Sequence, residues 1–108
     1  MAMTRLQYLL GKLAEECGEV AERALKAQAF GLEETRPGTS TNNADLIFEE
    51  CNDVEGIKKM LADEFGMDFT PCPVQIANKI DKVNGYYFYS INCGMCEPEG
   101  GEIKSHGN

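Results

Sequence analysis

Apolar residues recur every three or four positions in three segments of the chain, and polar residues fill the positions between them. This spacing is typical of amphipathic helices, and it predicts helices over about residues 4–30, 44–65 and 73–92. Thr4 suits the N-cap of the first helix, and Gly31 suits its end. The apolar positions are Leu6, Leu9, Leu10, Leu13, Cys17, Val20, Ala21, Ala24 and Leu25 in the first segment, Leu46, Val54, Ile57 and Leu61 in the second, and Ile76, Ile80, Val83, Tyr87 and Ile91 in the third.

Turn-forming residues separate these segments. Residues 33–43 contain proline, glycine and a polar run, so we expect a loop whose last residues cap the second helix. Gly66 suits the end of that helix, and two prolines mark the next connection. Gly85 lies inside the third helix, where it costs about 1 kcal/mol relative to alanine. No alternating strand pattern competes, so the expected fold class is all-α.

The chain of 108 residues has the size of one domain, which we assign to residues 1–95, followed by a flexible C-terminal tail over residues 96–108. We expect an antiparallel helical bundle of three main helices. Three amphipathic helices of this length leave an apolar stripe uncovered, so we expect homo-oligomerisation, as a homodimer or homotetramer, to complete the bundle.

Charge and cysteine content narrow the classes of function. A net charge of -8 argues against a nucleic-acid partner, which would require a basic footprint. No apolar run is long enough for a signal peptide or a membrane span, so we expect a cytoplasmic protein with no membrane partner. Five cysteines are an odd, scattered set, and we expect reduced thiols.

Two short acidic clusters carry the most specific chemistry. Residues 15–19 read Glu-Glu-Cys-Gly-Glu, and residues 49–53 read Glu-Glu-Cys-Asn-Asp. Each cluster places carboxylates three residues apart in a predicted helix, so each pair shares one flank of its helix. Two such pairs facing each other would provide a site for hard divalent cations.

In the first helix, Glu16 and Glu19 lie on one flank of the apolar stripe, while Glu15 points away from it. Ordinary surface ion pairs are the alternative interpretation. Lys12 precedes Glu16 by four residues and Arg23 follows Glu19 by four, so each glutamate has a basic partner within reach.

The second helix places Glu50 in the middle of its apolar stripe, with Asp53 about 60° away. An ionised carboxylate that faces a core requires a cation, a basic partner or a proton. Lys79 in the third helix is one candidate for a basic partner. A lone lysine would explain Glu50 but would leave the other acids unexplained.

A site made only of carboxylate oxygens favours Mg²⁺, Mn²⁺ or Ca²⁺ over zinc or copper. Mg²⁺ keeps several waters and often takes substrate phosphates among its ligands, so we expect the site to bind a polyphosphate. A di-iron carboxylate centre would require a Glu-x-x-His pair on each of two helices. The only histidine is His106, in the tail, which argues against that centre.

The two acidic motifs resemble the signature helices of the MazG-like all-α nucleoside triphosphate pyrophosphohydrolase superfamily. Residues 13–21 read Leu-Ala-Glu-Glu-Cys-Gly-Glu-Val-Ala, and residues 49–54 read Glu-Glu-Cys-Asn-Asp-Val. The resemblance covers about residues 6–95, and the chain is similar to compact phage-encoded members. A single Glu-x-x-Glu carries little weight, but the doubled motif in this order is fairly specific.

The resemblance implies Mg²⁺-dependent hydrolysis of a (deoxy)nucleoside triphosphate between the α and β phosphates, with Mn²⁺ as a substitute. It implies that Glu16, Glu19, Glu50 and Asp53 bind the metal, that Glu15 and Glu49 act as further ligands or support the site indirectly, and that Lys79 and Lys82 contact the phosphates. In the mechanism that we expect, a glutamate not fully used in coordination, Glu19 or Glu49, is the general base. The chain departs from the family pattern in two ways. Residues 33–43 lengthen the linker, as a lid or a surface excursion. The arginine-rich form of the third-helix motif is absent.

Two other uses of the chain stay open. One is a non-catalytic helical oligomer whose acidic groove binds a cation or a basic partner. The other is a zinc clip at Cys93 and Cys96, which supply half of a tetrahedral shell and would require Cys72, His106 or a second protomer to complete it.

Overall fold

A computed structural model describes residues 1–99 and contains three helices: α1 (Arg5–Phe30), α2 (Asn43–Phe65) and α3 (Pro73–Asn92). The expected all-α class is confirmed for these residues, and each helix begins and ends within one residue of the expected bounds. The described residues contain no β-strand, although an isolated β-bridge joins Thr35 and Asn42. None of the described helices is long and apolar enough to cross a membrane.

The helix ends have the chemistry that the sequence predicts. The side chain of Thr4 accepts a hydrogen bond from the backbone N–H of Gln7, whose own side chain accepts one from Thr4, so both orphan donors are satisfied. Asn42 and Asp45 form the same reciprocal pair at the start of α2. Gly66 ends α2 in the left-handed conformation, with φ at 70°.

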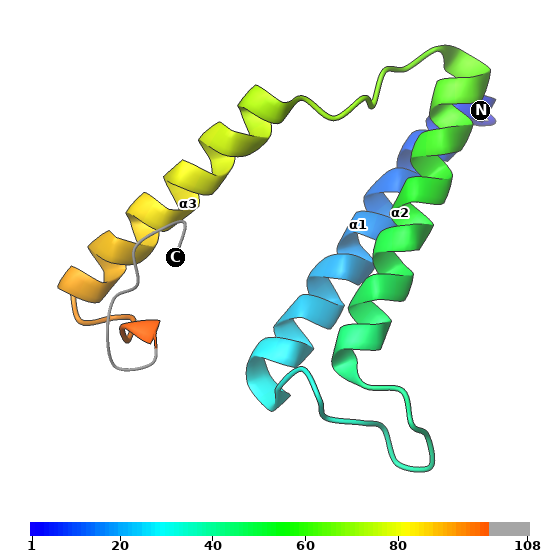
Figure 1. The fold of residues 1–108 in the computed structure, drawn as a ribbon. Coiled ribbons are helices and arrows are strands. Elements are labelled where there is room, and N and C mark those ends of the chain that lie inside the picture. Colours follow the sequence, from blue (N-terminus) through cyan, green and yellow to red (C-terminus); the bar gives the residue numbers. More distant parts are fainter. Residues whose placement is uncertain (100–108) are drawn as a thin grey trace. The chain divides into compact units, whose positions relative to one another are not determined.

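The chain divides into two compact units, Met1–Phe69 and a second that begins at Thr70. In the first unit, α1 and α2 form an antiparallel hairpin and lie side by side along their length (Figure 1). Leu9 and Leu61, one from each helix, are the hydrophobic side chains that become fully buried. The assignment of residues 1–95 to one domain stays a prediction.

Both ends of the hairpin are closed by polar contacts. At the loop end, buried Asn43 donates from Nδ2 to the carbonyl oxygen of Gly31 at 2.8 Å and to Oε1 of Glu34 at 2.9 Å. At the other end, Arg5 donates to both carboxylate oxygens of Glu64, at 2.9 and 3.1 Å. These contacts fix which residues of α1 face which residues of α2.

In the second unit, α3 runs without interruption through Gly85. Its C-terminal end is joined to the residues that follow, because Tyr87 donates from its hydroxyl to the carbonyl oxygen of Glu97 at 2.6 Å. The first residues of the expected tail therefore contact α3. The remainder of that tail, residues 100–108, lies outside the described residues.

Candidate metal centre

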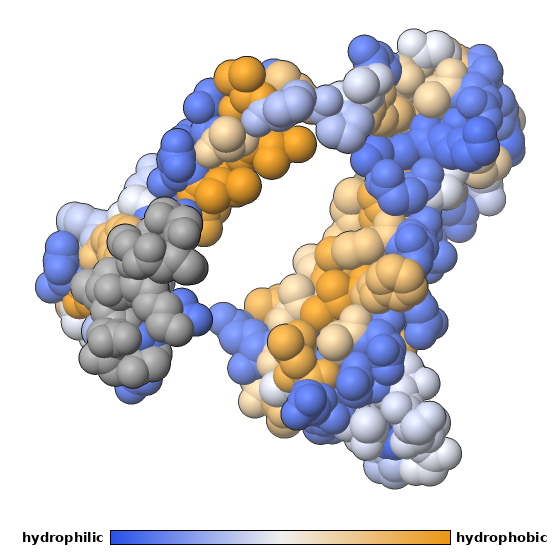
Figure 2. Space-filling model, viewed as in Figure 1, coloured by the Kyte–Doolittle hydropathy of each residue, from blue (hydrophilic) through white to orange (hydrophobic). Residues whose placement is uncertain are grey.

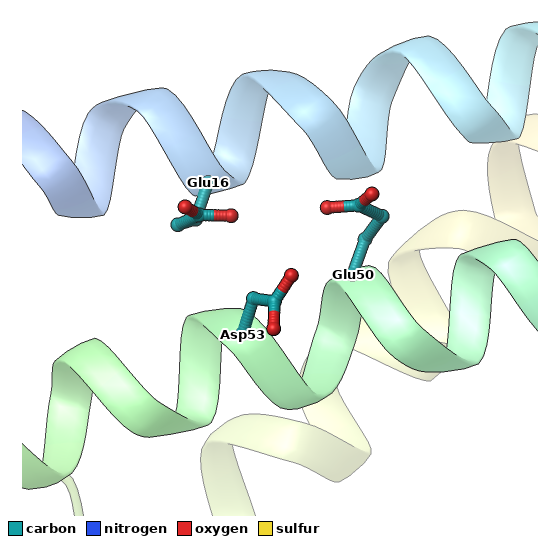
Figure 3. Close-up of side chains that lie close together, drawn as sticks. All are labelled: Glu16, Glu50 and Asp53. Carbon is teal, nitrogen blue, oxygen red and sulfur yellow. The ribbon is translucent and has the colours of Figure 1, made fainter.

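Three of the four acids predicted to bind metal come together in the middle of the hairpin. Glu16 extends from α1, and Glu50 and Asp53 extend from α2, so that the carboxyl groups point toward one another (Figure 3). Each residue offers one oxygen, and these oxygens all lie within 4.8 Å of one another. This arrangement brings the two acidic motifs to one point.

The sequence pattern explains why these three meet. Glu50 occupies a position of the apolar stripe of α2, so packing against α1 leaves its side chain only 15% exposed. Asp53 is one helical turn further along and exposed, and Glu16 is partly buried. The centre is therefore closed on the side of Glu50 and open to solvent at Asp53.

Burial and mutual repulsion of the acids shift the proton affinity of the cluster. Partial burial raises the pKa of Glu16 above its usual value of 4.5, because the charged form loses hydration. Neighbouring negative charges raise this pKa further, in the order Asp53, Glu50, Glu15 and Glu19. The charge of a divalent cation at this point would offset both effects on this pKa.

The donor set fits a hard cation. Metal–oxygen bonds of about 2.0–2.1 Å for Mg²⁺ and 2.3–2.6 Å for Ca²⁺ place opposite ligands roughly 4–5 Å apart. The limit of 4.8 Å between the carboxylate oxygens lies in that range. Glu16, Glu50 and Asp53 can thus hold one such ion after small side-chain rotations, with waters or phosphate oxygens as the remaining ligands.

Sequence reasoning missed Arg23. Its Nε lies 3.7 Å from Oε1 of Glu50, and the two side chains are 17% and 15% exposed. The sequence offers Lys79 as a basic partner for Glu50, and helical spacing offers Glu19 as a partner for Arg23. The signal was the spacing of Arg23, seven residues or two turns after Glu16, which places both on the face of α1 that meets α2.

The other predicted acids lie outside the three-residue cluster. Glu19 is partly buried, and its charge contributes to the raised pKa of Glu16, but it does not belong to the group within 4.8 Å. Glu49 is exposed. Exposed Glu15 accepts a hydrogen bond from Lys12 at 3.2 Å, so the partner of Lys12 is Glu15 rather than Glu16.

The predicted phosphate contacts belong to the second unit. Lys79 and Lys82 are exposed on α3 and line a pocket together with Gln75 and Asn78. The two lysines and the two amides offer hydrogen-bond donors on one side of this helix. The described structure therefore gives them a shared surface suited to anions.

An apolar groove runs along the hairpin beside the acidic cluster. It is lined by Cys17 and Val20 from α1 and by Cys51, Val54 and Glu55 from α2. Cys17 follows Glu16 and Cys51 follows Glu50, so the cysteines are rotated by about 100° from the acids on their helices. Hydrophobic residues gather along the visible surface of the hairpin (Figure 2).

All five cysteines are free and exposed. Ser90 donates to Sγ of Cys96 at 3.1 Å, which gives this thiol a partner other than a metal. The proposed fourth ligand of a zinc clip, His106, lies outside the described residues. The zinc interpretation stays a prediction.

Comparisons with protein-family models, with curated proteins and with solved structures find no match for this chain.

Proposed function

We propose that this protein is a Mg²⁺-dependent nucleoside triphosphate pyrophosphohydrolase, which cleaves its substrate between the α and β phosphates. The observation that carries the proposal is the meeting of Glu16, Glu50 and Asp53, with oxygens within 4.8 Å of one another. The resemblance of the two acidic motifs to those of the MazG-like superfamily supports the proposal. Such a hydrolase would act on the nucleotide pool of the cytoplasm.

In the proposed reaction, a water oxygen forms a bond to a phosphorus atom while the bond to the bridging oxygen between the α and β phosphates breaks. The products are the monophosphate and pyrophosphate. Bound Mg²⁺ would lower the pKa of a water and offset the charge on the leaving group. Glu16, Glu50 and Asp53 would hold the ion, and Glu19 would be a further ligand.

The remaining roles follow from chemistry and position. Glu49, or an oxygen of Glu19 that does not bind the ion, would accept the proton of the attacking water. Lys79 and Lys82 would contact the phosphates. Glu15 would support the site only indirectly, since its carboxylate pairs with Lys12.

The test is pyrophosphate release from dATP, dCTP, dGTP and dUTP under Mg²⁺, with wild-type protein and the Glu50→Gln variant. We expect release from at least one nucleotide and a loss of about 10²-fold or more in the variant, because an essential ligand is replaced by a weaker neutral donor. The matched control is Glu22→Gln, which makes the same change on an exposed residue of α1 that pairs with Lys26. This control should retain full activity.

Release that persists in Glu50→Gln would contradict the assignment of the site. No release from any nucleotide, together with Mg²⁺ binding, would favour the alternative: a non-catalytic helical oligomer whose acidic groove binds a cation or a basic partner. The same cluster of three acids favours this second candidate, because cation binding requires no further catalytic group.

We also propose that the protein is a homodimer that associates through the groove lined by Cys17, Val20, Cys51 and Val54. The 23-residue α2 is about 35 Å long, and two packed helices are roughly 20 Å wide, so one face covers on the order of 700 Å² in projection. This area is close to the ~800 Å² per partner of a stable interface.

A further inference from the structure

Arg23 lies beside the acidic cluster without a hydrogen bond to it. Its Nε is buried, yet this N–H has no hydrogen-bond partner among the described residues. Nearly all buried donors in proteins have a partner, so an orphaned donor beside a candidate site requires an explanation. The nearest acid to this group is Glu50, whose Oε1 lies 3.7 Å away.

A distance of 3.7 Å allows electrostatic attraction but is too long for a hydrogen bond. A hydrogen bond from N–H to oxygen spans about 2.7–3.2 Å, so Arg23 and Glu50 attract each other without bonding. In the same hairpin, Arg5 binds both oxygens of Glu64 at 2.9 and 3.1 Å. An arginine on α1 can therefore reach a bonded geometry across to α2, and Arg23 does not adopt it.

Glu50 has both like and opposite charges around it. The carboxyl group of Glu50 points toward Glu16 and Asp53 (Figure 3), and Nε of Arg23 lies 3.7 Å from its Oε1. Three carboxylates and one guanidinium share this part of the hairpin. Arg23 is thus placed to offset part of the repulsion among these carboxylates.

We propose that Arg23 is an internal counter-cation, a positioning residue that stabilises the metal-free cluster through Glu50 and competes with the divalent cation for that carboxylate. This inference rests on the metal site of the proposed function. A bound dication and the guanidinium repel each other across Glu50, and partly buried charges are screened less than exposed ones. Arg23 therefore limits the affinity for the bare ion and favours its uptake together with a negatively charged nucleotide.

The experiment compares Mn²⁺ binding, measured by electron paramagnetic resonance without nucleotide, in wild type, Arg23→Gln and Arg23→Lys. We expect Arg23→Gln to bind Mn²⁺ about tenfold more tightly, because one nearby positive charge is removed. We expect its thermal unfolding midpoint to be lower than that of wild type in EDTA and to rise more on addition of Mn²⁺. Arg23→Lys keeps the charge and should retain the wild-type affinity.

Lys26→Gln is the matched control. Lys26 also lies 3.7 Å from a glutamate, Glu22, but both side chains are about half exposed, at 49% and 56%. The variant removes the same charge about one turn further along α1. Its Mn²⁺ affinity and its response to the ion should equal those of wild type.

Each outcome bears on the proposal. Mn²⁺ binding by wild type that is unchanged or weaker in Arg23→Gln would overturn the role of Arg23 and leave the metal site standing. Absence of binding in wild type would overturn both. If Arg23→Gln is unfolded in EDTA, recovery of its helical circular dichroism with Mn²⁺ supports the inference, and failure to recover overturns it.

Discussion

Glu16 contributes to the dependence of the protein's stability on pH. Its pKa is raised in the folded state by burial and by neighbouring acids, so the folded chain holds this proton at a pH where the unfolded chain has lost it. Glu16 therefore lowers the free energy of unfolding as pH rises from about 4.5 through the raised pKa. Below that range its unfavourable contribution is absent.

We expect Glu16→Gln to unfold at a higher temperature than wild type at pH 7 in EDTA, and the difference to shrink toward pH 4, because glutamine carries no charge to repel. Thermal unfolding followed by circular dichroism measures it. Glu22→Gln, at an exposed position that pairs with Lys26, should show no comparable gain. An equal gain in both variants at pH 7 would contradict the strain assigned to Glu16.

For single residues, the sequence was sufficient to predict those positions that depend only on the geometry of one helix. Carboxylates three residues apart share a helix flank, and Glu50 lies in the apolar stripe, so the meeting of Glu16, Glu50 and Asp53 could be predicted. Arg23 was not identified, because helical spacing offered it Glu19 on its own helix. Its observed partner lies across the helix pair, and the choice depends on packing that spacing alone does not specify.

Among the helices, two glycines of the same hairpin should respond in opposite ways to the same substitution. Gly56 lies inside α2 with nothing within 4 Å of an added Cβ, so Gly56→Ala should raise the free energy of unfolding by about 0.5–1 kcal/mol. Gly66 has φ at 70°, where a side chain is strained, so Gly66→Ala should lower it by about 1–2 kcal/mol.

Urea unfolding of the two variants measures both effects against wild type. A loss of stability in Gly56→Ala would indicate that the open space beside it is filled by a partner in solution. Unchanged stability in Gly66→Ala would contradict the left-handed helix end.

The helices themselves could be predicted closely, because periodicity, caps and stop residues all agree on residues 4–30, 44–65 and 73–92. The polar contacts that close the two ends of the hairpin could not be predicted from the sequence. Asn43 looks from the sequence like one of several polar residues at the end of a loop, yet it is buried and bonded to Gly31 and Glu34. Such a role depends on where the chain returns after the loop.

For the whole molecule, the proposed dimer places Cys17 and Cys51 at the interface between two copies. We expect mild oxidation to produce a disulfide-linked dimer from a chain that keeps only these two cysteines. A chain that keeps only Cys72, which is exposed outside the groove, should yield far less. Non-reducing gel electrophoresis and light scattering measure this.

A net charge of -8 on each copy adds a second expectation, since the copies repel and added salt screens the repulsion. The dimer fraction should therefore rise with ionic strength. A mass equal to the single chain of 11.9 kDa at all salt concentrations would contradict the dimer and would indicate that the groove is covered within one chain.

The anchoring of Asn43 separates the length of the loop from the register of the helices. Its two hydrogen bonds, together with the bridge between Thr35 and Asn42, tie the chain where it leaves α1 and where it enters α2. Residues between these ties can be added or removed without shifting one helix along the other. The segment from Arg36 to Thr41 is therefore a natural insertion point for an affinity tag or a fluorescent reporter that leaves the carboxylates in alignment.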